Sequence, residues 1–378
     1  MAKVLKAKSR LLVEAMAAGN DSGLGRHVRL LLRFMPDLGD DWDVLVLWPA
    51  HARERPPLGV QIKRVKPIFA RLWIHWTLPL WVRRWRADVV LHLGYTLPVR
   101  AGSARRILLV PDMGPLEKTS TRMSRHAVAN ARAMHRQIPL AARIWVSTEF
   151  TSRRLQAILG IPNGKIDQLP PFDGYARAWR AEPAISAAIR EKYPLGFFLT
   201  VGNIEPRKNH IAILNAMAWL RERHVDFPPL ILAGHQAWDN GVTRSATADL
   251  GLTDNVVFTG HIEDAALAGY WQGALGFITA SLYEGFGMPL FEALTLGKAA
   301  IYQAGTAHDD FAHGAALALE TRDRDALGQA MEKLWLDEEW RKGWEEKARS
   351  RGNALLQSDL GSRMRSALER LLPSQSES

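Results

Sequence analysis

Two glutamates frame a glycine-rich turn in the second half of the chain, within the stretch Ser281 to Glu292. Glu284 precedes two glycines, Gly285 and Gly287, and Glu292 follows them on a segment whose proline favours a helix start. The glycines leave the backbone bare, and the amides at a helix start attract phosphate. Because carboxylates bind hydroxyls, the stretch predicts a ligand that carries both hydroxyl and phosphate groups. A sugar nucleotide carries both.

A pair of adjacent cations lies about eighty residues earlier. Arg207 and Lys208 follow an apolar run that ends at Val201. Ligands bind beyond the carboxyl ends of strands in open α/β sheets. Charge-assisted hydrogen bonds from such cations to a diphosphate contribute about 1.5–3 kcal/mol each. A solvated surface pair is the alternative for these two residues alone. Together with the glutamate-framed turn, they favour a diphosphate site.

The composition is that of a two-domain protein with an uneven charge. The chain has 378 residues and no cysteine, which excludes disulfides and thiolate metal sites. It lacks an apolar run of membrane-spanning length and a signal-peptide core, so a cytoplasmic location is expected. Residues 1–180 hold 30 Lys and Arg against 13 Asp and Glu, a net charge of +17, and the remainder carries −7. This asymmetry predicts a negatively charged partner for the first half, such as an anionic membrane, a phosphorylated acceptor or nucleic acid.

One segment, residues 71–86, mixes tryptophan with arginine and contains no acid. Its four tryptophans are Trp73, Trp76, Trp81 and Trp85. Tryptophan settles at membrane interfaces and arginine pairs with anionic headgroups, so we expect this segment to dock on a membrane. The alternative is a helix that buries its tryptophans in the core. Stacking on single-stranded nucleic acid is the least favoured interpretation.

The rest of the chain alternates short apolar runs with helical patterns. A strand at 11–16, a glycine-rich loop at 19–25 and a helix at 26–35 are typical of a Rossmann-like start, although a turn that merely needs glycine gives the same pattern. The alternation predicts parallel α/β sheets. Residues 160–196 are rich in Pro, Gly and Ala and predict an inter-domain connection. The further strands are expected at 43–48, 87–92, 106–110, 143–147, 197–201, 230–233, 256–258, 275–278 and 300–302.

Several motifs in order resemble the retaining glycosyltransferases of family 4. They are Ser22-Gly-Leu-Gly-Arg-His27, Val146-Ser-Thr-Glu-Phe150, Gly202-Asn-Ile-Glu-Pro-Arg-Lys-Asn209, Phe258-Thr-Gly-His261 and the stretch from Glu284 to Glu292. The resemblance implies the GT-B fold, two Rossmann-like doubly wound domains facing a cleft. Residues 1–172 would form the acceptor-side domain, 173–353 the nucleotide-sugar domain, and about 354–378 a helix crossing back.

The resemblance also implies roles for residues. Arg207 and Lys208 would hold the donor diphosphate and stabilise the leaving group, Glu284 would contact the transferred sugar, and Glu292 the ribose. The remaining donor contacts that it implies are Gly23, Gly25, Gly202, Phe258, His261, Gly285, Phe286, Gly287 and Met288. Many relatives carry His-Asp where this chain has Pro111-Asp112. Asp112 would serve the acceptor side, and His126 is a substitute for the missing histidine unless it is structural or solvated.

The expected function is transfer of a hexose from a nucleotide sugar to a lipid-linked acceptor at the inner face of the cell membrane. GDP-mannose is the first donor, with an α-linked product on a polyprenyl diphosphate oligosaccharide, as in bacterial exopolysaccharide and O-antigen mannosyltransferases. A UDP-hexose donor, a soluble acceptor, or a protein that binds nucleotide sugars without turnover are the alternatives.

The expected chemistry needs no metal and no cofactor, because fixed cations offset the charge that develops on the diphosphate. Front-face attack, with the leaving phosphate helping to deprotonate the acceptor, is the mechanism that the family resemblance implies. Double displacement with Glu284 as nucleophile is the alternative. No nucleic-acid partner is expected.

Overall fold

The chain folds into two compact units. Its end returns to the first of them. The computed structural model describes residues 8–20, 23–66, 69, 72–94, 97, 100–117, 125–172, 182–237, 239 and 241–371, with the backbone alone at 115 and 125–130. The chain passes from the first unit to the second after Tyr175 and returns to the first at Ser358. The sequence had placed these two points after residue 172 and near residue 354.

The first unit is built on a parallel sheet with the strand order β3-β2-β1-β4-β5-β6-β7. The order changes direction between β1 and β4, since β2 and β3 lie on one side of β1 and the later strands on the other. Its described strands are β1 (Ser9–Glu14), β2 (Trp42–Pro49), β3 (Gln61–Val65), β4 (Val89–His92), β5 (Arg105–Leu109), β6 (Arg143–Val146) and β7 (Ile166–Gln168).

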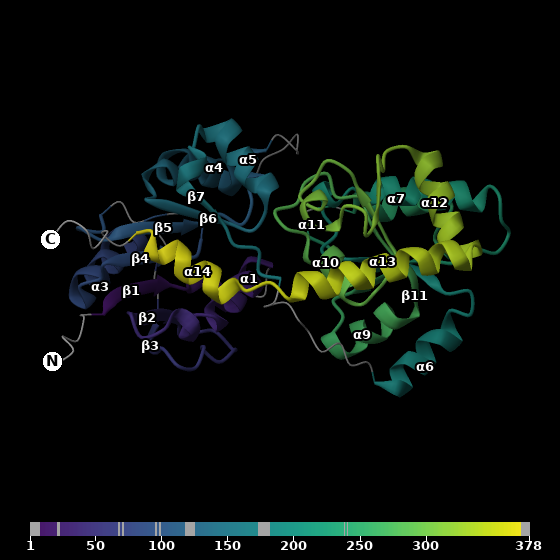
Figure 1. The fold of residues 1–378 in the computed structure, drawn as a ribbon. Helices are drawn as coiled ribbons and strands as arrows, with labels where there is room; N and C mark the ends of the chain where they lie inside the picture. Colours follow the sequence, from purple (N-terminus) through teal and green to yellow (C-terminus); the bar gives the residue numbers. More distant parts are fainter. Residues whose placement is uncertain are drawn as a thin grey trace. The chain divides into compact units, whose positions relative to one another are not determined.

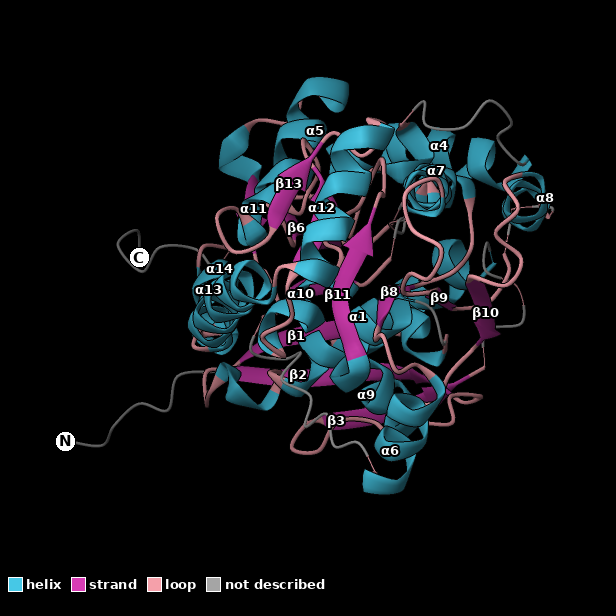
Figure 2. Ribbon diagram, turned by 90° about the vertical axis from the view of Figure 1, so that its right-hand side faces the viewer, coloured by secondary structure: helices cyan, strands magenta, loops and turns pink. Residues whose placement is uncertain are grey.

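Helices flank the strands of this sheet (Figures 1 and 2). The α-helices of the first unit are α1 (Gly23–Arg33), α3 (Leu78–Trp85), α4 (Arg125–Gln137), α5 (Glu149–Leu159) and α14 (Leu360–Glu369). The short ones are η1 (Met16–Gly19), η2 (Pro36–Leu38), the π-helix η3 (Trp73–Thr77), η4 (Gly114–Leu116), η5 (Ile138–Leu140) and η6 (Asn163–Lys165).

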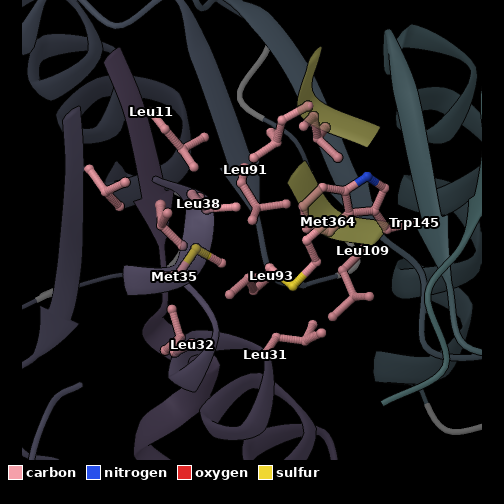
Figure 3. Close-up of a cluster of buried hydrophobic side chains, with 14 of the residues drawn as sticks. Leu11, Leu31, Leu32, Met35, Leu38, Leu91, Leu93, Leu109, Trp145 and Met364 are labelled. Atoms are coloured by element: carbon pink, nitrogen blue, oxygen red, sulfur yellow. The ribbon is translucent and has the colours of Figure 1, made fainter. Parts of the chain in front are cut away.

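The core of the first unit includes the last helix of the chain. Strands β1 and β4 are apolar along most of their length and buried, as expected for parallel strands covered on both faces. Met364 of α14 lies among the core side chains, near Leu109 and Trp145 (Figure 3). The guanidinium of Arg363 donates to the carbonyl of Gln168 at 2.7 Å. Residues 360–371 are thus an integral part of the first unit.

The tryptophan-rich segment forms η3 and α3, and its tryptophans have different surroundings. Trp73 is 5% exposed and its Nε1–H donates to Glu14 Oε1 at 3.2 Å. Trp81 and Trp85 are half-buried against the core. Trp76 is 69% exposed. The prediction that Trp73 contacts a membrane is therefore wrong, because its ring is buried in the first unit and its N–H is bonded to Glu14 of β1.

The second unit is built on a parallel sheet with the order β10-β9-β8-β11-β12-β13. Here the direction changes between β8 and β11. Its described strands are β8 (Phe197–Val201), β9 (Leu230–Ala233), β10 (Val256–Gly260), β11 (Ala274–Thr279), β12 (Ala300–Gln303) and β13 (Leu317–Leu319). Its helices are α6 (Pro183–Lys192), η8 (Pro206–Lys208), α7 (His210–Arg221), α8 (Val242–Asp249), α9 (Asp264–Gly273), α10 (Met288–Thr295), α11 (Asp309–Ala312), α12 (Arg324–Leu336) and α13 (Glu338–Leu356).

Three edge strands were not expected. Strand β3 is largely exposed and charged, so it lacks an apolar run, while β7 and β13 have three residues each. Residues 160–196, predicted as a connection, contain β7 and α6. An edge strand is covered by fewer neighbours, so it needs fewer apolar residues. The apolar run that predicts a strand is then missing.

Side-chain caps mark where the last helices begin. Asp337 Oδ1 accepts from the amide of Trp340 at 2.9 Å, and Asp359 Oδ1 accepts from the amide of Ser362 at 2.8 Å. Such caps satisfy amides that the helix itself leaves without a partner. The Asp359 cap lies between α13, which belongs to the second unit, and α14, which belongs to the first.

Two glycines of α13 allow a test of its packing on α10. A Cβ atom at Gly352 would lie 2.4 Å from the carbonyl oxygen of Leu294, whereas a Cβ atom at Gly343 would meet nothing within 4 Å. We expect Gly352→Ala to lower the free energy of unfolding by about 1–3 kcal/mol, because backbone must move. Gly343→Ala should instead stabilise by up to about 1 kcal/mol. Urea unfolding of both variants tests this, and equal effects would contradict it.

Candidate functional site

The two loops that carry the predicted site follow neighbouring strands of the second unit. Strand β8 leads to η8, and its neighbour β11 leads to the turn before α10. These strands are the ones between which the strand order changes direction, where ligands bind in open α/β sheets. The backbone amide of Leu282 donates to the carbonyl of Arg207 at 2.8 Å, so the two loops are joined directly.

Glu284 is held by both predicted cations. Arg207 Nη1 donates to Glu284 Oε2 at 2.8 Å, and Lys208 Nζ donates to Oε1 at 2.6 Å. Arg207 also contacts Glu205 Oε1 at 2.7 Å and the carbonyl of Tyr283 at 3.0 Å. The sequence placed these three charged side chains in one site, and the structure brings them together.

The electrostatics favour an ionised Glu284. Burial of this carboxyl opposes ionisation, but the charges of Arg207 and Lys208 outweigh it and hold the pKa of Glu284 well below its usual range. Only 8% of its side chain is exposed, against 37% for Arg207. The site thus contains a buried carboxylate with two cations, one of which remains partly open to solvent.

A histidine that the sequence did not single out lies under the turn. Gly287 has a φ of +90°, and a Cβ atom there would come within 2.0 Å of His308 Nε2. The glycine is required twice, by its left-handed backbone and by the imidazole against it. His308 is 1% exposed, and burial lowers its pKa to about 4, so the ring is neutral.

The remaining residues of the turn divide between the site and the core. The Phe286 ring stacks on Phe311 with centroids 5.2 Å apart, so this side chain anchors the turn. Met288 begins α10 and is half-buried, and Gly285 is also half-buried. Glu292 lies on α10 and is 3% exposed.

The predicted base-contacting residues lie on and after β10. The guanidinium of Arg244 lies over the Phe258 ring, 4.2 Å from the ring centroid. His261 stacks on His235 with centroids 5.0 Å apart and ring planes 4° from parallel. Gly202, after β8, has a φ of +134°, and a Cβ atom there would lie 3.5 Å from Lys208 Nζ. Of these residues, Gly202 is directly beside the charged cluster.

The other predicted site residues belong to the first unit. A Cβ atom at Gly25 would come within 1.9 Å of the carbonyl oxygen of Asn20, whereas Gly23 has open space. Asp112 Oδ1 accepts from the amide of Gly114, the first residue of η4, at 2.7 Å. His126 lies on α4, and its side chain is outside the described residues.

Two site residues were missed for different reasons. Glu205 lies in the stretch Gly202 to Asn209, but the family resemblance implied no role for it, whereas the structure pairs it with Arg207. His308 lies just before α11, 21 residues beyond Gly287, in a segment with no recognised spacing. No local sequence signal pointed to it, because its partner is a bare α-carbon brought there by the fold.

Solved structures of low sequence identity share the fold over the whole chain. Sucrose-phosphate synthase from Thermosynechococcus elongatus aligns with a TM-score of 0.71 at 17% identity, over 96% of this chain and 99% of its own. HepE from Anabaena, in complex with UDP-glucose, aligns with a TM-score of 0.69 at 13% identity, over 96% and 99%. The structure is thus a GT-B fold of two Rossmann-like units, as the sequence predicted.

The family match lies within the second unit. Residues 183–351 match the family described as glycosyl transferases group 1. The O-antigen chain mannosyltransferase B of Escherichia coli is 26% identical over 215 residues. The match spans 56% of this chain and 56% of the length of that relative. None of the described helices combines the length and apolarity needed to cross a membrane.

The neutral state of His308 generates a pH prediction. In the unfolded chain this imidazole titrates near a pKa of about 6.5, while in the fold its pKa is about 4. The unfolded state therefore binds more protons between these pH values. Stability must fall as the pH drops through this window, by up to about 1.4 kcal/mol per pH unit.

We expect His308→Gln to remove this contribution, so that the free energy of unfolding falls less steeply between pH 6 and 4.5. Urea unfolding at several pH values measures the slope. His210, also buried with a pKa lowered to about 4 by burial and by nearby Lys208, makes a matched variant with the same expected effect. A slope equal to that of the wild type in His308→Gln would contradict the prediction.

Proposed function

We propose that the chain is a glycosyltransferase that moves a hexose from a nucleotide sugar to a lipid-linked acceptor. The observation that carries this proposal is the buried Glu284 carboxylate with Arg207 and Lys208 on its two oxygens, beside a glycine turn and a helix start. A carboxylate binds sugar hydroxyls, and the cations and amides bind a diphosphate. The match of this region to the group 1 glycosyl transferases supports the same function.

The proposed chemistry uses the two cations at the leaving group. Cleavage of the sugar–phosphate bond places negative charge on the diphosphate, and preorganised cations stabilise that charge. In the structure these cations already neutralise Glu284, so they are fixed before a donor binds. We propose that transfer retains the configuration and needs no metal, so it should persist in the presence of EDTA.

Both oxygens of Glu284 are engaged in ion pairs, which supports a role in binding the sugar. A nucleophile for double displacement needs an oxygen free to attack the anomeric carbon. Front-face attack, with the leaving phosphate accepting the proton of the acceptor hydroxyl, is therefore the mechanism we propose. Glu292 would hydrogen-bond the ribose.

The proposed donor is GDP-mannose. Its support is the similarity to the O-antigen chain mannosyltransferase B of Escherichia coli. The fold shared with HepE, whose structure contains UDP-glucose, makes a UDP-hexose the second candidate. Calorimetry with GDP-mannose, UDP-glucose and UDP-N-acetylglucosamine separates these donors. Binding of GDP-mannose at least tenfold tighter than the UDP sugars is expected.

The catalytic proposal is tested by comparing alanine variants of a buried ion pair with alanine variants of an exposed ion pair. We expect Lys208→Ala and Glu284→Ala each to lower kcat/KM for transfer by about 100-fold or more, the effect of removing one charge-stabilising group. Lys342 and Glu338 form an exposed pair at 2.8 Å on α13, and their alanine variants serve as matched controls. Unchanged transfer in Lys208→Ala and Glu284→Ala would refute the enzymatic assignment. Donor binding without turnover by the wild type would identify a binding protein.

An exposed apolar face on the first unit supports a membrane-bound acceptor. Phe69, Leu72, Trp76 and Leu80 are 65%, 53%, 69% and 66% exposed. Leu72, Trp76 and Leu80 follow one another at spacings of four residues, which places them on one face of the helical segment, and Phe69 precedes that segment. The opposite face buries Trp73, Leu78 and Val82.

Cations surround this apolar face. Exposed basic residues precede it on and after β3 and follow it at the end of α3, namely Lys63, Arg64, Lys66, Arg83, Arg84 and Arg86. Lys63 Nζ lies 5.9 Å from the ring centroid of Trp81, which places β3 next to α3. Apolar side chains bordered by cations fit a surface of anionic phospholipid. We propose that the protein docks there as a peripheral membrane protein.

The docking proposal predicts that the variant Leu72→Ser, Trp76→Ser, Leu80→Ser is released from vesicles with 30% anionic phospholipid. The three side chains are exposed, so the fold should be retained. Val225 and Leu336 are exposed apolar residues of the second unit, and Val225→Ser, Leu336→Ser is the matched control. Co-sedimentation measures binding. Equal binding by both variants would contradict the proposal.

A further inference from the structure

A short segment of the second unit lies behind the glycine turn that precedes α10. We call residues 304–312, which lead from β12 through α11, the backing segment. The amide of Ala304 donates to the carbonyl of Leu319 on β13 at 2.9 Å. The amide of Gly305 donates to Asp309 Oδ2 at 2.8 Å. The first bond joins the backing segment to the sheet and the second closes it on itself, so its shape does not depend on the turn.

Two side chains of the backing segment contact the turn. The ring of Phe311 stacks on Phe286 with centroids 5.2 Å apart. His308 faces the next residue of the turn, because a Cβ atom on Gly287 would lie 2.0 Å from its Nε2 and 2.3 Å from its Cδ2. The backing segment therefore contacts the turn at two consecutive residues.

His308 contributes packing at this position. Its Nδ1 is buried and makes no hydrogen bond in the part of the chain that the structure describes. The rings of Tyr302 and Phe311 meet it edge-on, with centroids 5.7 and 6.1 Å away. The charges of Glu284 and Lys208 act on its pKa, so the ring lies beside the charged cluster. His308 is thus a neutral ring enclosed between two aromatic side chains and the turn.

The turn offers two adjacent amides. The amides of Leu290 and Phe291 donate to the carbonyl of Gly287 at 3.1 and 3.3 Å, where α10 begins. The amides of Gly287 and Met288 make no hydrogen bond within the described residues. Unpaired amides at a helix start attract phosphate. The turn thus faces a ligand with backbone donors as well as with the nearby cations.

A glycine does not hold such amides in one direction by its own preference. Glycine adopts positive and negative φ about equally well, so the φ of +90° at Gly287 needs support from its surroundings. Protein interiors are closely packed and resist changes of shape. An imidazole against the α-carbon of Gly287 supplies that support.

We propose that His308 is a positioning residue for the donor, which holds the turn so that the amides of Gly287 and Met288 face the diphosphate. This inference rests on the proposed glycosyltransferase function and adds a residue to its donor site. His308 is 1% exposed and acts through the turn, without contact to the donor. The ligand class is a nucleoside diphosphate, with or without its sugar, because backbone amides bind phosphate oxygens.

The first test varies the length of the side chain at residue 308. Calorimetry with GDP-mannose and with GDP measures affinity, and UDP-glucose and UDP take their place if the wild type binds UDP sugars more tightly. His308→Asn ends short of the Nε2 position and should raise the Kd of both ligands about tenfold, the effect of weakening a hydrogen bond to a charged group. The donor KM should rise equally, with an unchanged acceptor KM. His308→Gln reaches the Nε2 position and should keep most of the affinity.

The second test uses the close approach of the imidazole to Gly287. Gly287→Ala should weaken donor binding more than His308→Asn does, because its Cβ atom displaces the turn. The double variant Gly287→Ala, His308→Ala lacks the atoms that this Cβ atom would meet. It should therefore bind the donor more tightly than Gly287→Ala alone, a coupling expected only of residues in contact.

A glycine just beyond the other end of α10 supplies the matched control. Gly297 has a φ of +63°, and a Cβ atom there would lie 2.9 Å from Arg349 Nε. Gly297→Ala is thus also a strained substitution, but it lies at the opposite end of the helix from the turn. Its donor Kd should equal that of the wild type.

The outcomes distinguish the two proposals. A wild-type donor Kd in both His308→Asn and Gly287→Ala overturns the inference alone. A double variant that binds no more tightly than Gly287→Ala also overturns it. An equal rise of the Kd in Gly297→Ala does so too, since that pattern indicates a general effect on the fold. A wild-type protein that binds none of the three sugar nucleotides overturns the proposed function as well.

Discussion

The ion pairs of one buried carboxylate determine how the second unit arranges its loops. Glu284 cannot stay ionised away from water without its partners, and Arg207 and Lys208 come from a loop that follows a different strand. The loops after β8 and β11 must therefore approach closely, and the Leu282 amide bonded to the Arg207 carbonyl shows that they do. The glycine turn, the neutral His308 and the start of α10 all follow from that approach.

The sequence predicted those parts of the molecule whose residues carry a signal of their own. Apolar runs predicted most central strands, and the Arg207-Lys208 pair with the two glutamates predicted the charged site. It failed where the relevant partner is distant or featureless. His308 faces an α-carbon, Glu14 and His92 meet across two strands, and β3 is an edge strand with exposed charges. Trp73 shows the same limit, because composition does not say which of four tryptophans the sheet will bury.

The two sheets use the same topological position in different ways. The second unit places a partly exposed arginine and a largely buried lysine beside a carboxylate there, which suits a charged ligand. The first unit places the Glu14 carboxylate and the neutral His92 imidazole there, almost fully enclosed. The net charge of the two halves does not follow this difference, because the first 180 residues are strongly basic although their sheet has no cation in this pair. Exposed basic side chains of that half precede and follow the apolar face of α3.

The place of α14 also bears on synthesis. Leu360, Met364 and Leu368 complete the core of the first unit, yet the ribosome makes them after the whole of the second unit. Domains generally fold as the chain emerges, the N-terminal one first. Here the order must be reversed at the final step. The contiguous second unit is able to finish folding during translation, while the nascent first unit retains an uncovered apolar groove until the end of the chain is released.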